Sequence, residues 1–143
     1  ALRDNGVGNI QGFDLFEDYP YRHGSFTEVT KQIEELGLSD IATIDRSDAF
    51  EVHEPVDSID MLHVDISNNG DTFRKTFDLW ANKVTKAIVL EGGSQTRDQI
   101  DWMVEFSKPP IHVALEEIKV DYPQWSIFVF EPFPSVTVAL LNR

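Results

Sequence analysis

Residues 59–93 read IDMLHVDISNNGDTFRKTFDLWANKVTKAIVLEGG, and this stretch decides the fold class of the chain. Most of residues 59–66 are apolar, which is typical of a strand that is covered on both faces of a sheet. Asp71 can cap a helix over residues 71–83, because apolar side chains recur there at helical spacing. Residues 87–90 form a second apolar run. A strand, a helix and another strand in this order predict a parallel βαβ unit.

The same alternation continues toward the N-terminus. Residues 7–13 predict a strand, and residues 41–44 predict a second, shorter one. Between them, Ser25 and Glu28 have the spacing of a capping box at the start of an amphipathic helix. Gly37 supplies the stop signal of that helix. This half of the chain therefore predicts one more strand, helix and strand.

Toward the C-terminus the pattern ends in two consecutive strands. Ser94 can cap a helix that reaches to about Phe106, and residues 111–120 predict another helix. Residues 125–131 and 136–141 predict strands whose connection is short enough for a hairpin. The sequence thus predicts an α/β fold, a three-layer, mostly parallel, Rossmann-like sheet with a C-terminal antiparallel hairpin.

Composition limits the partners and the location of the protein. The chain has 143 residues, 41% of them hydrophobic, which favours a single domain over residues 1–143. A net charge of -13, from 25 acidic and 12 basic residues, disfavours a nucleic acid or a membrane surface as partner. The apolar runs are far shorter than the roughly 20 residues of a membrane span. A small-molecule ligand and a cytoplasmic location are the default expectations.

Four acidic residues follow the predicted parallel strands. Asp14, Asp48, Asp65 and Glu91 each come at or just after the end of a strand. Ligands of open α/β sheets bind beyond the carboxyl ends of the strands. The sequence therefore predicts a functional site on this edge.

The order of elements resembles that of the class I S-adenosylmethionine-dependent methyltransferases, whose sheet also closes with an antiparallel hairpin. Shorter stretches resemble the macrocin O-methyltransferase-type family, which methylates sugars and small molecules. They are IQGFDLFE at 10–17, ELGL at 35–38, IDMLHVD at 59–65, PQW at 123–125 and PSVT at 134–137. The resemblance implies methyl transfer from S-adenosylmethionine to an oxygen atom.

The resemblance also implies roles for particular residues in cofactor binding. Asp14 would accept hydrogen bonds from the ribose hydroxyls, and Ser47 and Asp48 would lie beside the adenine. The alternative for Asp14 is a solvated loop carboxylate or a helix cap. The acidic neighbours Glu17 and Asp18 make an acidic loop equally compatible with the sequence.

A magnesium site is implied at the next two strand ends. Asp65 and Glu91 match acidic ligands of the family, but Ser67 and Gly92 stand where further acids are expected. Magnesium needs only one or two carboxylates besides water and substrate oxygens, so the two remaining acids could bind it. Otherwise Asp65 caps a turn and Glu91 is a loop acid.

Histidines are the candidate proton acceptors. His63 precedes Asp65 by two residues, which places both on one side of their strand and makes His63 a candidate catalytic base. The alternative is a histidine satisfied in the core. His53 and His112 are weaker candidates, because they fall on predicted loop and helix surfaces. His23 belongs to an aromatic loop, residues 19–23, which could cover a substrate or pack as a surface loop.

The family's Gly-rich turn, between its first strand and helix, has no counterpart before Asp14. We therefore expect an upstream segment or another chain to complete the sheet between the strands that end at Asp14 and Asp65, unless the sheet is rearranged. If an upstream segment completes the sheet, residues 1–143 are the C-terminal portion of a longer domain. Two functions remain open, a small-molecule or sugar O-methyltransferase and a non-catalytic domain with a binding or structural role in a larger assembly.

Overall fold

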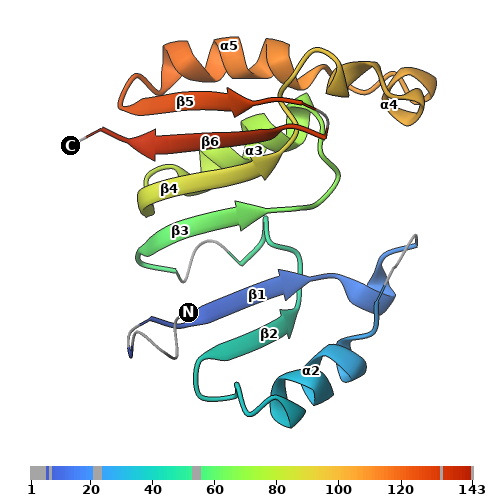
Figure 1. Ribbon diagram of the computed structural model, residues 1–143, viewed down its shortest axis with the longest axis vertical. Helices are drawn as coiled ribbons and strands as arrows, with labels where there is room; N and C mark the ends of the chain where they lie inside the picture. The colour runs from blue at the N-terminus through green and yellow to red at the C-terminus, as the bar shows by residue number, and fades with distance from the viewer. Residues whose placement is uncertain (1–5, 7, 21–23, 53–55, 133, 143) are drawn as a thin grey trace. The chain divides into compact units, whose positions relative to one another are not determined.

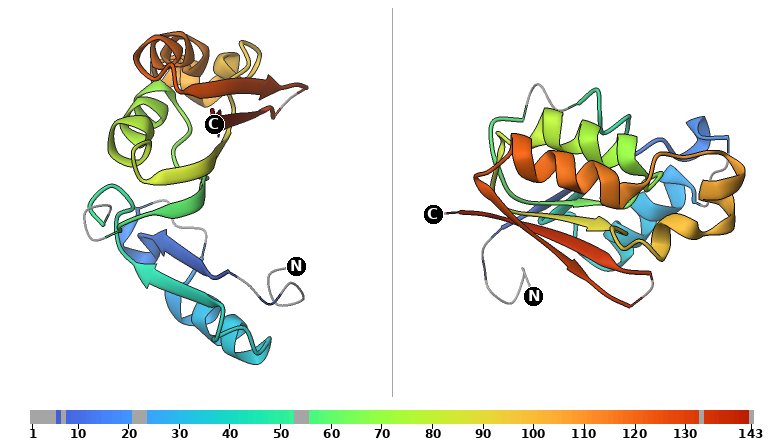
Figure 2. Two further views of the ribbon diagram at one scale, coloured as in Figure 1. Left: turned by 90° about the vertical axis from the view of Figure 1, so that its left-hand side faces the viewer. Right: turned by 90° about the horizontal axis from the view of Figure 1, so that it is seen from above.

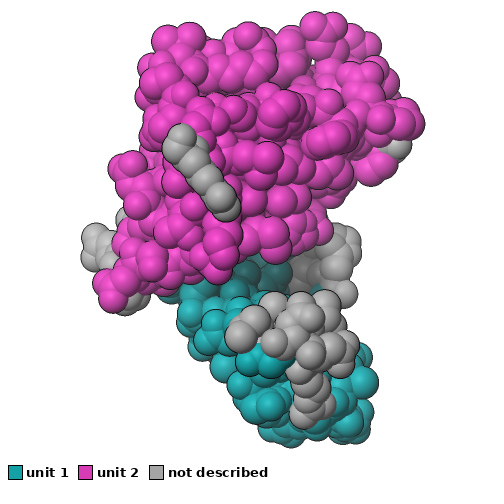
Figure 3. Space-filling view, turned by 60° about the vertical axis from the view of Figure 1, so that its left-hand side comes forward, with its two compact units in different colours: residues 1–52 teal, residues 53–143 magenta. Residues whose placement is uncertain are grey.

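The computed structural model describes residues 6, 8–20, 24–52, 56–132 and 134–142. The chain forms two compact units, residues 1–52 and residues 53–143 (Figure 3). Each unit combines strands with helices. The α/β character expected from the sequence is therefore present in both.

The first unit is a parallel strand pair with a helical connection. Strand β1 (Ile10–Asp14) pairs with β2 (Ala42–Arg46) in parallel, from Ile10 opposite Ala42 to Asp14 opposite Arg46. The connection contains a 3-10 helix, η1 (Phe16–Asp18), and helix α2 (Phe26–Glu35), which packs against β2. Parallel pairing brings the carboxyl ends of β1 and β2 to the same edge.

Helix α2 ends as the sequence predicts at its C-terminus, but its N-terminus is capped by a residue outside the predicted motif. At its C-terminus Gly37 adopts a φ of 63° and the Leu38 amide bonds the Ile33 carbonyl, as the sequence predicted for a glycine stop. At its N-terminus Ser25 occupies the cap position, but its side chain makes no capping hydrogen bond. Glu17 supplies the bond instead, because its Oε1 accepts from the Phe26 amide at 3.1 Å.

The second unit contains a four-stranded sheet in the order β3-β4-β6-β5 (Figure 1). Strands β3 (Ile59–Val64) and β4 (Val84–Glu91) are parallel, whereas β6 (Val136–Leu141) runs antiparallel to both β4 and β5 (Trp125–Phe130). The predicted hairpin is confirmed by the pairing of β5 with β6. Only β6 is reversed within this sheet.

Two helices lie side by side on one face of this sheet, α3 (Gly70–Trp80) and α5 (Ile111–Asp121) (Figure 2). The short elements η2 (Arg97–Gln99) and α4 (Asp101–Glu105) come between β4 and α5. The core between the helices and the sheet contains fully buried side chains from both layers, among them Phe73, Phe77, Ile88, Leu90, Leu115, Ile118 and Ala139. None of the described helices has the length and apolarity that a membrane crossing needs.

Three local predictions for this unit are wrong. Strand β3 is not covered on both faces: Val64 is 8% exposed and belongs to the core, whereas Met61, on the opposite face, is 62% exposed. Helix α3 is capped by Asn69, whose Oδ1 accepts from the amides of Asp71 and Thr72, so Asp71 is not the cap. The predicted helix after Ser94 is interrupted, since the extended backbone of Ile100 separates η2 from α4.

Strands β1 and β3 each have one sheet partner in the described part of the chain, β2 and β4 respectively. Direct pairing of β1 with β3 is not among the ladders formed by these residues, so the rearranged sheet is not observed. Each strand keeps one edge with unpaired backbone groups. Such an edge is a template for a further strand.

Candidate functional site

The three predicted cofactor residues lie together at the carboxyl ends of β1 and β2. The Ser47 amide donates a 2.9 Å hydrogen bond to the Asp14 carbonyl oxygen, which fastens the two strand ends to each other. Asp48 follows directly and its Oδ1 accepts from the Phe50 amide at 2.8 Å. This edge therefore presents two carboxylates and one hydroxyl in a short space.

Some hydrogen-bonding groups of these residues have no partner within the described part of the chain. Asp14 is exposed and its Oδ1 accepts from the Phe16 amide, so the local turn that the sequence allowed occupies one carboxylate oxygen. The Ser47 Oγ is buried and has no hydrogen-bond partner among the described residues. A buried hydroxyl without a partner is uncommon in native proteins. A hydroxyl-bearing or amine-bearing ligand at this edge would satisfy it.

The loop beside this edge is acidic and held by ion pairs. Arg46 lies 3.8 Å from a Glu17 carboxylate oxygen and 3.4 Å from one of Asp18. A hydrogen bond from its own backbone amide, followed by one from Ser25, lowers the pKa of Glu17. The lowered pKa favours the ionised form of the Glu17 carboxyl beside this edge.

The two predicted metal ligands also meet, at the carboxyl ends of β3 and β4. Burial raises the pKa of Glu91, and a side-chain hydrogen bond with Asp65 raises it further. Asn68 donates from Nδ2 to Glu91 Oε2 at 3.4 Å. The described residues contain no group of three or more His, Cys, Asp or Glu side chains that could hold a metal ion. Asp65 and Glu91 thus form a pair rather than a complete carboxylate cluster.

Arg97 and His63 are the basic residues near this pair. Both lower the pKa of Glu91, Arg97 more than His63, although burial and Asp65 outweigh them. His63 is exposed on β3, so it is not the core histidine that the sequence left as an alternative. His23 and His53 lie outside the described residues.

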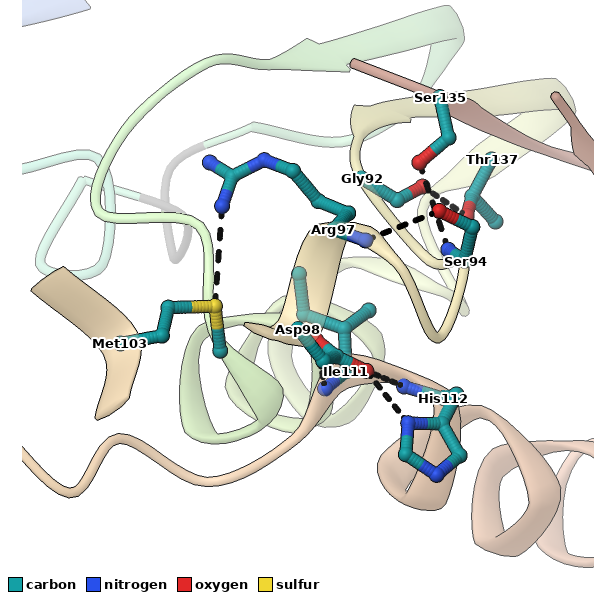
Figure 4. Close-up of polar contacts among 9 residues, drawn as sticks. All are labelled: Gly92, Ser94, Arg97, Asp98, Met103, Ile111, His112, Ser135 and Thr137. Atoms are coloured by element: carbon teal, nitrogen blue, oxygen red, sulfur yellow. Dashed lines mark hydrogen bonds and ion pairs between the residues drawn. The ribbon is translucent and has the colours of Figure 1, made fainter. Parts of the chain in front are cut away.

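The turn after β4 is fixed to β6 by polar contacts. Thr137 donates from Oγ1 to the Gly92 carbonyl at 2.7 Å, and the Ser94 amide donates to Ser135 Oγ at 3.3 Å (Figure 4). Gly92 has a φ of 107°, and a Cβ there would lie 2.7 Å from Ile111 Cδ1. An acidic side chain at position 92 would not fit without displacement of its neighbours.

Asp98 anchors the start of α5. Its carboxylate accepts from the Ile111 amide at 2.7 Å, from the His112 amide at 2.9 Å and from His112 Nδ1 (Figure 4). His112 is therefore engaged in a structural contact.

Sequence reasoning missed several polar residues around this turn, including Asn68, Arg97, Asp98, Ser135 and Thr137. The adjacent glycines at 92 and 93 were the available signal, because both have positive φ and lie in close packing.

Comparison with known proteins identifies the fold. No family model and no curated protein matches the sequence. Among solved structures, an O-methyltransferase family protein from Burkholderia thailandensis has 12% identity and a TM-score of 0.66, over 99% of this chain and 46% of its own. An rRNA methylase from Streptococcus thermophilus has 9% identity and a TM-score of 0.63, over 94% of this chain and 74% of its own.

A third neighbour was solved in complex with S-adenosyl-L-methionine. It comes from Streptococcus pneumoniae and is provisionally assigned as a tRNA methyltransferase, with 11% identity and a TM-score of 0.59 over 99% of this chain and 59% of its own. At these identities the likeness concerns the fold, and the expected Rossmann-like methyltransferase fold class is confirmed. The chain spans about half to three quarters of the length of these neighbours.

Proposed function

We propose that the protein containing this chain is an S-adenosylmethionine-dependent O-methyltransferase that acts on a small molecule or sugar. The observation that carries the proposal is the buried Ser47 hydroxyl, which has no partner among the described residues, on a residue whose amide bonds the Asp14 carbonyl at the ends of two parallel strands. It occurs in a fold shared with methyltransferases, one of which was solved with this cofactor. The macrocin-like specificity suggested by the sequence is part of the proposal.

The cofactor residues would act as hydrogen-bond partners. Asp14 has acceptor capacity for the ribose hydroxyls, and the buried Ser47 Oγ needs a partner that the described chain does not supply. Asp48 would accept from the exocyclic amine of the adenine. These residues fit the chemistry of the nucleoside half of the cofactor.

The acceptor region would be the edge that holds His63, Asp65 and Glu91. When bound, S-adenosylmethionine supplies an electrophilic methyl group to an oxygen nucleophile. His63 would take the proton that the acceptor hydroxyl loses as the new oxygen–carbon bond forms and the sulfur–carbon bond breaks. Asp65 and Glu91 would position the acceptor, and positioning is a major source of rate enhancement in such a displacement.

Magnesium at Asp65 and Glu91 is a further part of the proposal. Two carboxylates together with water satisfy this ion, and the free Asn68 Oδ1 offers one more oxygen. Asp65 and Glu91 would hold the ion, which would supply positive charge to stabilise a deprotonated acceptor oxygen.

The charge of the chain favours a small molecule over RNA as the acceptor. Two of the neighbours carry names of RNA-modifying enzymes. A net charge of -13 repels a phosphate backbone, whose binding depends on basic contacts. An RNA acceptor would therefore require basic surface from elsewhere in the protein.

A non-catalytic methyltransferase-like domain is the second candidate function. It is favoured by the close packing around Gly92, which excludes the second acid of the resembled family. Such a domain would keep the fold and have a binding or structural role in a larger assembly. A fold alone does not separate the two functions.

The deciding experiment measures cofactor binding and methyl transfer by the natural protein that contains these residues. We expect S-adenosylmethionine to bind in calorimetry and S-adenosylhomocysteine to form with an acceptor. Asp14→Asn should weaken binding about tenfold to a hundredfold, because hydrogen bonds to charged groups contribute about 1.5–3 kcal/mol. Asp45→Asn is the matched control, since Asp45 is an exposed acid of β2 that bonds Gln11 instead. Absence of cofactor binding by the wild-type protein would overturn the enzymatic proposal.

A further inference from the structure

Arg97 is a buried cation held in a fixed place. Its residue is 6% exposed, and its amide donates to Ser94 Oγ at 3.2 Å in the turn that β6 also fastens. Its guanidinium contacts the Met103 sulfur, with Nη1 to Sδ at 3.6 Å (Figure 4). Its Cζ lies 5.7 Å from the centroid of the Trp102 ring. A thioether and an aromatic face stabilise a cation weakly, and neither supplies the negative charge of a direct ion pair.

Two other arginines of the described chain are paired with acids. Arg46 lies within 4.0 Å of Glu17 and Asp18, and Arg74 is paired with Asp78 and Asp121. Among the described residues Arg97 forms no such ion pair, although the chain has 25 acidic side chains. An unpaired buried charge is expensive, so native proteins usually give it a counterion.

A second buried polar group at the same edge lacks a partner. Asn68 is 5% exposed, its Nδ2 donates to Glu91, and its Oδ1 accepts no hydrogen bond in the described part of the protein. Arg97 and Asn68 both lie beside the carboxyl end of β4, because Asn68 donates to Glu91 Oε2 at 3.4 Å and a Cβ on the next residue, Gly92, would lie 3.5 Å from Arg97 Cγ. The edge therefore offers an unused cation and an unused hydrogen-bond acceptor near one carboxyl pair.

We propose that Arg97 and Asn68 form an oxyanion subsite for a small ligand that carries a carboxylate or phosphate together with a hydroxyl group. The planar guanidinium binds the oxyanion through two parallel hydrogen bonds. The hydroxyl donates to Asn68 Oδ1. Naming this ligand as the methyl acceptor rests on the proposed function, whereas the oxyanion binding itself does not.

The subsite also accounts for how an acidic protein would select an anionic ligand. With a net charge of -13, the surface as a whole disfavours anions. A single desolvated arginine reverses this preference locally, because charges interact more strongly where water is excluded. Ligands without an oxyanion would leave the Arg97 charge uncompensated and bind less well.

The test uses inorganic phosphate and acetate as probes, titrated without cofactor into the protein. The ¹⁵N resonance of Arg97 Nε is followed by NMR and assigned by its loss in Arg97→Gln. We expect saturable movement of this resonance, with a dissociation constant around 1 mM. Movement with phosphate alone indicates a phosphorylated ligand, movement with acetate alone indicates a carboxylate, and movement with both leaves oxyanion recognition intact.

Variants separate the subsite from general charge effects. Arg97→Gln should weaken phosphate or acetate binding at least tenfold in calorimetry, whereas Arg74→Gln, which removes a paired exposed arginine, should leave it unchanged. Asn68→Ala should weaken binding of glycolate, which has a hydroxyl, more than binding of acetate. Equal binding by wild type and Arg97→Gln, or an Arg97 resonance unmoved by both probes at about 50 mM, would overturn the proposal.

Two further readouts keep the test decisive. If Arg97→Gln does not fold, the resonance in the wild-type protein, assigned through its backbone connectivity, gives the answer. Cofactor binding is measured in parallel on the same samples. Failure of cofactor binding with intact oxyanion binding removes only the identification of the ligand as a methyl acceptor, whereas the reverse result removes the subsite and leaves the proposed function standing.

Discussion

The carboxylate of Asp98 accepts a 2.7 Å hydrogen bond from the amide of Ile111, the first residue of α5. It also accepts from the next amide, that of His112. The residue before the helix is Pro110, which has no capping side chain. The first-turn amides of α5 are thus satisfied by a residue 13 positions earlier in the chain.

This contact predicts a large stability loss for Asp98→Ala. The substitution leaves two helix-terminal amides without their acceptor and should lower the free energy of unfolding by about 2 kcal/mol. Urea unfolding followed by circular dichroism measures the change. Asp101→Ala is the control, because Asp101 is exposed and should cost well under 1 kcal/mol. Equal losses for both variants would contradict the capping role.

Gly92→Ala should destabilise the protein for steric reasons. Gly92 has a φ of 107° and a Cβ would lie 2.7 Å from Ile111 Cδ1, so alanine meets both backbone strain and a clash. We expect a loss of about 2–3 kcal/mol in thermal or urea unfolding. At Gly24 an added Cβ meets nothing within 4 Å, so Gly24→Ala should be nearly neutral. A neutral Gly92→Ala would show that the turn after β4 can relax.

The sequence was most informative where local pattern decides structure. Strand β6 occupies the predicted residues 136–141, because alternating apolar side chains follow a proline-rich turn. Helix α5 likewise starts where the proline pair ends. The pairs Asp14 with Ser47 and Asp65 with Glu91 followed from the rule that parallel strands end at one edge.

Features set by distant contacts were not predictable from the sequence. The cap of α2 comes from Glu17 and that of α5 from Asp98, and no local pattern marks either acid as a cap. The exposure of Met61 depends on what packs against its face of the sheet, which the hydropathy of the strand does not report. Arg97 resembled an ordinary surface arginine, since burial of a charge depends on the packing around it.

The raised pKa of Tyr122 predicts how the stability of the fold changes at alkaline pH. Burial, followed by the hydrogen bond to Asp78 at 2.7 Å, raises the pKa of Tyr122 to about 12. The folded-state pKa is above the ordinary value of 10.0, so the stabilisation is fully present below pH 10.0 and is lost as the pH rises through about 12. The difference in urea midpoint between wild type and Tyr122→Phe should therefore shrink over this range. Parallel midpoint curves for the two proteins would contradict the prediction.

Phe73 and Phe128 should differ sharply in their contribution to folding. Phe73 is fully buried at 0% exposure between α3 and the sheet, whereas Phe128 is 49% exposed on β5. Phe73→Ala should lower the free energy of unfolding by about 3–5 kcal/mol, because it leaves a cavity. Phe128→Ala should cost less than about 1.5 kcal/mol, and denaturant unfolding compares the two. A loss above 3 kcal/mol at Phe128 would mean that its sheet face is covered.

Asp65 decides whether the carboxyl pair is a metal site. If magnesium supports methyl transfer there, Asp65→Ala should lower the magnesium-dependent rate at least about tenfold while leaving cofactor affinity unchanged, because one of two carboxylate ligands is lost. The rate is measured as S-adenosylhomocysteine formation by the natural protein over a magnesium titration, with a chelator as the zero point. Asp60→Ala is the matched control, since Asp60 is an exposed acid of the same strand and is paired with Lys86 at 2.8 Å. If Asp65→Ala and Asp60→Ala give the same rate as wild type, Asp65 is a turn residue and the magnesium proposal is wrong.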